Sequence, residues 1–238
     1  MLFLLAATSL LADPPAAYEP WKPVPVPEAS WYRAASLRNG LLQRKPARVV
    51  FLGDSLTEFW PHHGRASWTA EFGTLQAVNL GLAADRVENV HQRLLNANLR
   101  RPGVEVVVLL AGTNNLAGDA AATPETVARG ILALAAKIRH KAPAAQVVVV
   151  SIPPSGYEAG TPLRQRIIAT NKILSEKLAG EKGYHWIDFH DLLLDAAGLW
   201  KEGFTIDGTH FDAAGYEVMG KAIGPVLREL VPDPAKQN

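Results

Sequence analysis

Two uninterrupted apolar runs, VVVLL at 106–110 and VVVV at 147–150, restrict the fold of this chain more than any other feature. A strand with one wet face alternates apolar and polar residues. A run without alternation is typical of a parallel strand that helices cover on both faces. Other short apolar segments alternate with longer amphipathic ones, and strands are expected at 48–53, 77–80, 105–111, 146–152 and 185–187. This alternation predicts a doubly wound α/β sheet.

The intervening segments carry helix signals. At 123–125, a Thr in the N-cap position precedes a Pro and a Glu in the first turn. Helices are expected at 29–44, 55–60, 86–98, 124–141, 162–178 and 213–230. We therefore predict one α/β domain at 29–232. It has three layers, α/β/α, and the middle layer is a five-stranded parallel, flavodoxin-like sheet. A chain of 238 residues that is 48% hydrophobic can bury the core such a domain needs.

The two ends of the chain lie outside this predicted domain. Residues 1–12, MLFLLAATSLLA, are too short to span a bilayer and resemble the apolar region of a signal peptide. No Lys or Arg precedes them, and Leu10 spoils the small-residue cleavage pattern. Export to the periplasm or medium is expected, and a cytoplasmic protein with an apolar tail is the alternative. Residues 13–28 are proline-rich and predict an extended tether, and residues 233–238 a tail.

Charge and composition exclude several classes of function. The formal net charge is +1, from 24 basic and 23 acidic residues without a block of one sign, so no nucleic-acid partner is expected. No stable membrane insertion is expected either. The absence of cysteine removes thiolate nucleophiles and Cys-based zinc sites. Neither a phosphate-binding loop, nor a dinucleotide fingerprint, nor H-E-x-x-H occurs. The sequence predicts no cofactor and no metal.

Small polar residues follow three successive predicted strands. The first strand ends in Gly53-Asp54-Ser55, the second continues into Asn79-Leu80-Gly81, and the third precedes GTNN at 112–115. Ligands of open α/β sheets bind beyond the carboxyl ends of the strands, so these groups are expected to meet at one edge. Ser55 is the candidate nucleophile there, and a serine hydroxyl needs an adjacent base.

His210 is the candidate base among seven histidines. It lies in the segment IDGTHFDAAGY, three residues after Asp207 and just before the last predicted helix. A carboxylate at that spacing can accept the Nδ1 proton and leave Nε2 facing a serine, as in a Ser-His-Asp triad. Asp-x-x-His alone is a weak signal, and a capping or turn role is the alternative. The other histidines lie in a polar turn, on helix surfaces or beside the last strand.

An acyl transfer also needs donors for the developing oxyanion. Gly81 can offer a backbone N–H at close approach, Asn114 its side-chain amide, and Ser55 its own N–H near a helix start. A turn role for Gly81 and a capping role for Asn114 are the alternatives.

These segments, GDSL at 53–56, Asn79-Leu80-Gly81, GTNN and DGTH at 207–210, occur in the order and spacing of the SGNH/GDSL hydrolases. From about Trp31 to Leu230 the chain most resembles the branch akin to platelet-activating-factor acetylhydrolase catalytic subunits. The resemblance implies Ser55 as nucleophile, His210 as base then acid, and Asp207 as its orienting partner. It implies Ser55, Gly81 and Asn114 as the oxyanion hole. Asp54 is structural in such relatives.

One position departs from the family. Many relatives carry a second glycine a few residues after the first, where this chain has Ala83-Ala84. The path of this loop is therefore left open.

The function that follows is a metal-independent serine esterase acting on short acyl esters, above all acetyl esters, with a small molecule or an acetylated glycan as substrate. A lipid or lysophospholipid acylhydrolase is the alternative, and a non-catalytic glycan-binding module is a weaker one. A core role is expected for Trp60, Trp68 and Trp200, and a sugar-stacking wall is the alternative. Relatives can form homodimers, and the sequence identifies no interface.

Overall fold

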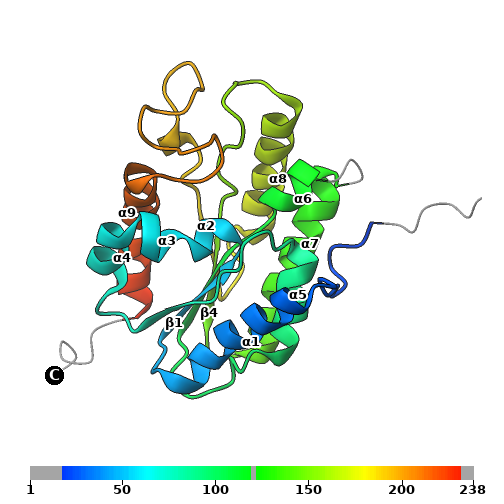
Figure 1. Cartoon of the computed structure of the whole chain (residues 1–238), viewed down its shortest axis with the longest axis vertical. Coiled ribbons are helices and arrows are strands. Elements are labelled where there is room, and N and C mark those ends of the chain that lie inside the picture. The colour runs from blue at the N-terminus through cyan, green and yellow to red at the C-terminus, as the bar shows by residue number, and fades with distance from the viewer. Residues whose placement is uncertain (1–17, 119–121, 232–238) are drawn as a thin grey trace, which may run out of the picture.

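Five parallel strands form the centre of the computed structural model, which describes residues 18–118 and 122–231. The strands are β1 (Val49–Gly53), β2 (Ala77–Asn79), β3 (Val106–Leu110), β4 (Gln146–Val150) and β5 (Tyr184–Ile187). Their order in the sheet is β2-β1-β3-β4-β5, and every pairing is parallel (Figure 1). The predicted flavodoxin-like α/β fold is confirmed.

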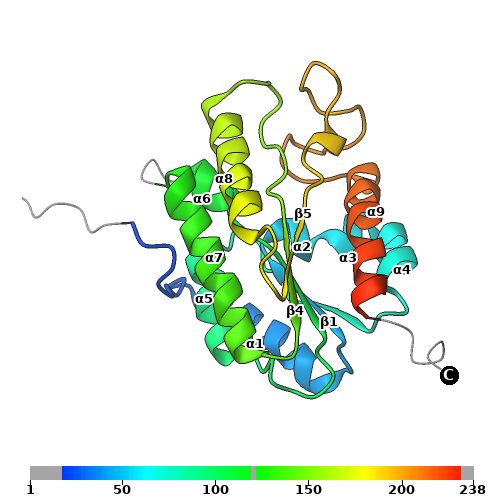
Figure 2. The ribbon, with the colours of Figure 1, turned by 180° about the vertical axis from the view of Figure 1, so that it is seen from behind.

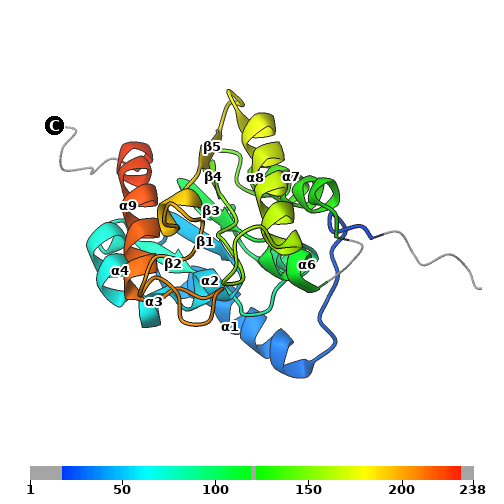
Figure 3. The ribbon, with the colours of Figure 1, turned by 90° about the horizontal axis from the view of Figure 1, so that it is seen from above.

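Helices cover both faces of this sheet. On one face lie α1 (Ala29–Arg44), α5 (Val87–Asn96), α7 (Pro124–Lys141) and α8 (Pro162–Leu178), and on the other α4 (Arg65–Phe72) and α9 (Ala213–Leu230) (Figures 2 and 3). Alternate residues of β1 serve the two cores: Val50 and Leu52 pack with the first group of helices, Val49 and Phe51 with the second. Each strand therefore needs apolar residues on both faces, which explains the uninterrupted runs.

Side-chain caps begin several of these helices where the sequence predicts them. The hydroxyl of Thr123 accepts from the Thr126 N–H at 3.3 Å, with Pro124 at the first helical position of α7. Thr161 and Pro162 repeat this arrangement at α8. The cap and the proline together fix where each helix begins.

The segment after Ser55 is more divided than predicted. Instead of one helix at 55–60, the chain forms the single turn α2 (Ser55–Glu58) and then α3 (Trp60–His63), joined at Phe59. The helix α4 and two elements further along, α6 (Thr113–Gly118) and the 3₁₀ turn η1 (Asp191–Leu193), were not predicted. Such short pieces lack the long apolar periodicity by which sequence reasoning finds helices.

Where the structure describes it, the proline-rich segment contains a turn at 19–22 and is not a free tether. The Val24 N–H donates to the Glu88 carbonyl at 3.1 Å, and the Asn89 amide returns a bond to the Val24 carbonyl at 2.9 Å. The Arg129 guanidinium lies 3.8 Å from the centre of the Trp21 ring. Val24 is therefore docked on α5 and Trp21 on α7, a correction to the predicted tether. The predicted signal segment at 1–12 and the tail at 233–238 lie outside the described residues.

Among the helices at 18–118 and 122–231, none is both long and apolar enough to traverse a lipid bilayer.

Candidate active site

The corner between β1 and α2 presents Ser55 at the carboxyl edge of the sheet. Gly53 ends the strand where a Cβ would lie 2.3 Å from the Leu110 carbonyl oxygen, so the close strand contact requires glycine. Asp54 then caps α2 by accepting from the Leu56 N–H at 3.0 Å. Ser55 is the first residue of α2, where a helix leaves backbone N–H groups without intrahelical partners.

Ser55 meets the two residues predicted to activate it. Its Oγ lies 2.9 Å from His210 Nε2, across 155 residues of sequence. His210 Nδ1 lies 2.7 Å from Asp207 Oδ2. With Nδ1 donating to the carboxylate, Nε2 is left to accept the serine proton. The structure thus brings Ser55, His210 and Asp207 into one continuous relay.

The loop that carries His210 organises itself locally. Asp207 Oδ1 accepts from the backbone N–H groups of Thr209 at 3.0 Å and His210 at 2.8 Å. Partial burial acts to raise the pKa of Asp207. The bonds from His210 and Thr209 outweigh it and hold that pKa below its usual value. The carboxylate therefore stays ionised at neutral pH and can orient the imidazole.

A second loop, between β4 and α8, buttresses the first. The Gly156 N–H donates to the Gly208 carbonyl at 2.8 Å, and the hydroxyls of Ser155 and Thr209 lie 2.8 Å apart. The buried guanidinium of Arg164 donates to the Ser155 carbonyl at 3.1 Å and the Gly156 carbonyl at 2.9 Å. Sequence reasoning missed Arg164, because an arginine inside an amphipathic helix carries no local sign of its distant partners.

Asp54 differs from Asp207. It is fully buried, and burial raises its pKa from 3.8 to about 7. Its Oδ1 holds the Leu56 N–H, while its Oδ2 is buried without a hydrogen-bond partner. These contacts agree with the structural role that the family resemblance implies for Asp54.

Gly81 does not present a free donor. Its N–H already donates to Asn79 Oδ1 at 2.8 Å, and a Cβ there would lie 2.3 Å from the Glu58 backbone nitrogen. Glycine is required here because β2 continues directly against α2. The oxyanion role predicted for Gly81 is not supported by this geometry.

The rest of the loop offers another amide. The Leu82 N–H donates to the Gly53 carbonyl at 3.1 Å, Ala83 N–H to Glu58 Oε2 at 2.6 Å, and Asp85 N–H to the Leu82 carbonyl at 3.2 Å. Within the described loop 81–85, only the N–H of exposed Ala84 is left without a partner. Ala84 has φ +63°, so it keeps the left-handed conformation that glycine favours.

Asn114 reaches the same loop from α6. Its Nδ2 donates to the Asp85 carbonyl at 2.9 Å, which uses one of its two amide hydrogens. The side chain is therefore held beside Ala84–Asp85 with one hydrogen still available. Asn115, its neighbour, is instead buried and caps α5 by accepting from the Val87 N–H at 3.0 Å.

The three tryptophans do not form a sugar-stacking wall. Trp60 is buried in the α4/α9 core, and Trp68 packs in an aromatic cluster with its ring 4.9 Å from that of Phe51. Trp200 is also buried, and its Nε1 donates to the Gly156 carbonyl at 3.1 Å. The core role expected for these tryptophans is confirmed. The exposed aromatic beside the acid–base loop is Tyr157, whose ring lies against Gly208.

No cluster of three His, Asp or Glu side chains suited to a metal ion occurs in the part of the chain that the structure describes. Independence from metal stays a prediction for a chelator experiment.

Comparison with known proteins identifies the family. The model of the GDSL-like lipase/acylhydrolase family matches residues 51–218, a range that contains Ser55, Asn114, Asp207 and His210. The chain belongs to this family. Platelet-activating factor acetylhydrolase IB subunit alpha1 of Bos taurus is 30% identical over 187 residues, which cover 79% of this chain and 78% of the relative. This member of the GDSL-like family is therefore an acylhydrolase, an enzyme that cleaves carboxylic esters.

Solved structures share the fold. A GDSL-like lipase from Bacteroides thetaiotaomicron superposes with a TM-score of 0.66 at 20% identity, covering 83% of this chain and 97% of that one. An acetylxylan esterase from Geobacillus stearothermophilus gives a TM-score of 0.60 at 14% identity, covering 77% and 94%. At these identities the likeness concerns the fold.

Proposed function

We propose that this GDSL-family hydrolase removes acetyl groups from hydroxyls of a carbohydrate through an acyl-enzyme on Ser55. The observation that carries the proposal is the relay itself, with 2.9 Å between Ser55 Oγ and His210 Nε2 and 2.7 Å between His210 Nδ1 and Asp207. These distances are those a serine nucleophile and its general base require.

The reaction has two halves. Ser55 Oγ bonds to the ester carbonyl carbon while its proton passes to His210 Nε2. The tetrahedral adduct then releases the sugar alcohol, which takes that proton, and leaves acetyl-Ser55. A water molecule gives a proton to His210 and bonds to the acetyl carbon. Acetate leaves, and Ser55 recovers its proton. Asp207 stays ionised and stabilises the imidazolium in both halves.

Three donors serve the oxyanion in this proposal. They are the Ser55 N–H at the start of α2, the second Asn114 amide hydrogen, and the Ala84 N–H in place of Gly81. The support is the bonding of the 81–85 loop, where the Ala84 N–H is the one left over, together with the bond that brings Asn114 to Asp85. Donors fixed before the reaction stabilise the charge that develops on the carbonyl oxygen.

The choice of acetyl and of a sugar alcohol has separate support. Two of the relatives named above are an acetylhydrolase subunit and an acetylxylan esterase. Beside the acid–base loop, Tyr157 is 59% exposed and offers a flat aromatic surface to a sugar ring. An exported enzyme would meet acetylated glycans, and cell fractionation tests the export expected from residues 1–12.

Hydrolysis of p-nitrophenyl esters from acetate to octanoate tests the reaction, with Ser55→Ala as the comparison. We expect Ser55-dependent activity that falls steeply with acyl length. Activity that rises with acyl length would favour a lipid substrate, and equal activity of Ser55→Ala would remove Ser55 from the reaction.

Acetylated xylo-oligosaccharides test the alcohol. Tyr157→Ala should raise KM for them while leaving p-nitrophenyl acetate unaffected. Tyr32→Ala serves as control, because Tyr32 is also exposed but lies on α1. If both variants bind the oligosaccharide like the wild type, Tyr157 does not contact the sugar.

A further inference from the structure

We propose that Arg38 on α1 is a positioning residue for the oxyanion loop, residues 82–85, and acts through Glu58. The inference rests on the oxyanion role proposed above for Ala84. It gives a function in the reaction to α1, which lies before the segment matched by the family model.

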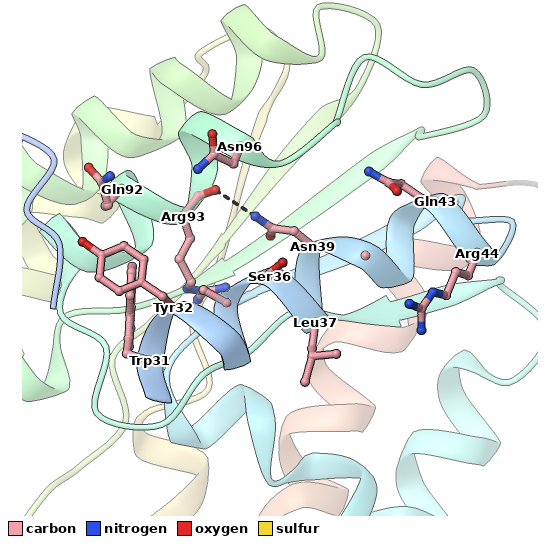
Figure 4. Close-up of a pocket in the computed structure, with 12 residues that line it drawn as sticks. Trp31, Tyr32, Ser36, Leu37, Asn39, Gln43, Arg44, Gln92, Arg93 and Asn96 are labelled. Atoms are coloured by element: carbon pink, nitrogen blue, oxygen red, sulfur yellow. Dashed lines mark hydrogen bonds between the residues drawn. The ribbon is translucent and has the colours of Figure 1, made fainter. Parts of the chain in front are cut away.

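The helix α1 is attached firmly to the edge of the site. Asn39 Nδ2 donates to the Arg93 carbonyl on α5 at 3.2 Å, and residues of α1 and α5, Trp31 and Arg93 among them, line a groove between the two helices (Figure 4). Trp31 Nε1 donates to Asp85 Oδ1 at 2.7 Å, and both side chains are buried. One end of α1 thus already contacts the last residue of the oxyanion loop.

Arg38 contacts the other end of that loop through one carboxylate. Its guanidinium pairs with Glu58 Oε1, and Glu58 Oε2 accepts the Ala83 N–H at 2.6 Å. Ala83 directly precedes Ala84. The carboxylate therefore joins a cation on α1 to the backbone just before the proposed donor.

The position of Glu58 makes this contact relevant to the chemistry. Glu58 is the last residue of α2, the single turn that begins with Ser55. A bond from Glu58 to Ala83 therefore sets the spacing between the nucleophile and the loop. On the far side of Ala84, Asp85 is held by Trp31 and by Arg93, whose Nε lies 2.5 Å from Asp85 Oδ2. Ala84 lies between two fixed neighbours.

Arg38 contributes the orientation of Glu58. The Glu58 side chain is 17% exposed and that of Arg38 is 28% exposed, so water can compete for the carboxylate. An ion pair of this intermediate exposure adds less to folding stability than a buried pair such as Asp85–Arg93. If Arg38 also fixes the carboxylate against Ala83, its loss should affect the oxyanion far more than the fold.

Arg38→Met tests this, with Arg33→Met as the matched control because Arg33 is an exposed cation on the same helix. Active sites are counted by titration with an organophosphonate, and kcat is measured per titrated Ser55. Removal of a whole oxyanion donor lowers kcat about 10²–10³-fold. A misplaced donor should cost less, and we expect a loss of about tenfold for Arg38→Met, with KM nearly unchanged and a small fall in the melting temperature. Arg33→Met should match the wild type.

A thionoester substrate separates positioning from a general structural defect. Sulfur is larger and accepts hydrogen bonds weakly, so a thionoester gains little from oxyanion donors. We expect Arg38→Met to lower the rate with the oxygen ester more than the rate with the thionoester. The single variant Arg38→Lys keeps the charge and should lose less kcat than Arg38→Met. The single variant Glu58→Gln keeps an acceptor for the Ala83 N–H and should also lose less.

Equal kcat in Arg38→Met and Arg33→Met would overturn the inference, as would equal losses on ester and thionoester. If Arg38→Met unfolds, the losses of kcat on the ester and on the thionoester are compared in Arg38→Lys and Glu58→Gln instead. Equal losses on the two substrates there would overturn the inference. A failure of the proposed function itself looks different, because Ser55→Ala would then keep the esterase activity of the wild type.

Discussion

The nucleophile corner, residues 53–58 with the 79–85 loop, and the acid–base loop, residues 205–210, hold their carboxyl groups in opposite ways. Asp54 in the corner is fully buried, and burial raises its pKa to about 7. The Asp207 side chain in the loop is 51% exposed, and bonds from His210 and Thr209 lower its pKa despite partial burial. Asp85 in the corner is also buried and pairs with Arg93 on α5.

The difference separates two tasks. The corner is held by buried long-range contacts such as the Asp85–Arg93 pair, so changes to those contacts should affect mainly folding. The acid–base loop is held by turns and carries an ionised carboxylate near solvent, so changes there should affect mainly the reaction. The predictions below test this separation.

Asp207→Asn should give the largest effect, a fall in kcat of about 10⁴-fold, since an amide no longer favours the imidazole tautomer that accepts from serine. Thermal unfolding should change little, because the Asn side-chain oxygen can still accept the two backbone N–H groups. Asp195→Asn is the control: Asp195 likewise accepts from Ala197 and Leu199 N–H groups in an exposed turn, and its kcat should not change. A large loss of stability in Asp207→Asn would break the comparison.

Arg93→Met should act on folding. Arg93 and Asp85 are 1% and 0% exposed, so the substitution leaves a buried carboxylate unpaired. We expect a loss of about 3–5 kcal/mol in the free energy of unfolding, measured by urea denaturation. Asp85→Asn added to it should recover part of this. Lys172→Met, which breaks the exposed pair with Glu176, should stay within about 1 kcal/mol. Similar losses for the two single variants would mean that burial does not distinguish the pairs.

The contrast between local and long-range contacts also explains which features the sequence could predict. The continuous apolar runs predict the sheet correctly, because each strand residue faces one of two cores and must be apolar. The Asp207–His210 pair could be predicted because three residues of chain suffice to form its hydrogen bonds. The free N–H group of the oxyanion loop could not be predicted in that way. Whether Gly81 or Ala84 keeps a free N–H depends on Glu58 and Gly53, and Glu58 depends on Arg38 in a different helix.

Asp54→Asn sharpens the comparison through pH. With a folded pKa of about 7 against 3.8 unfolded, the folded state keeps its proton in this window while the unfolded state loses it. Stability therefore falls as pH rises from about 4 to about 7 and levels off above, by a total of roughly 4 kcal/mol. Asp54→Asn should remove this fall. Asp207 has the opposite sign, since its lowered pKa adds stability that is lost as pH falls. An unchanged pH profile in Asp54→Asn would show that Asp54 is ionised in its buried site.

Ala84→Gly should give the smallest effect and tests the boundary between the two regions. Ala84 holds φ +63° without being glycine, which costs about 1 kcal/mol, and glycine relieves this cost at some loss of unfolded-state entropy. We expect unfolding free energy to rise by at most about 1 kcal/mol, as in Gln76→Gly, where φ is +49° far from the site. Activity should stay within about twofold, because glycine adopts the same left-handed backbone and keeps the N–H. A large loss of kcat in Ala84→Gly alone would mean that the Ala84 methyl group contacts the acyl group, in addition to the role proposed for the Ala84 N–H.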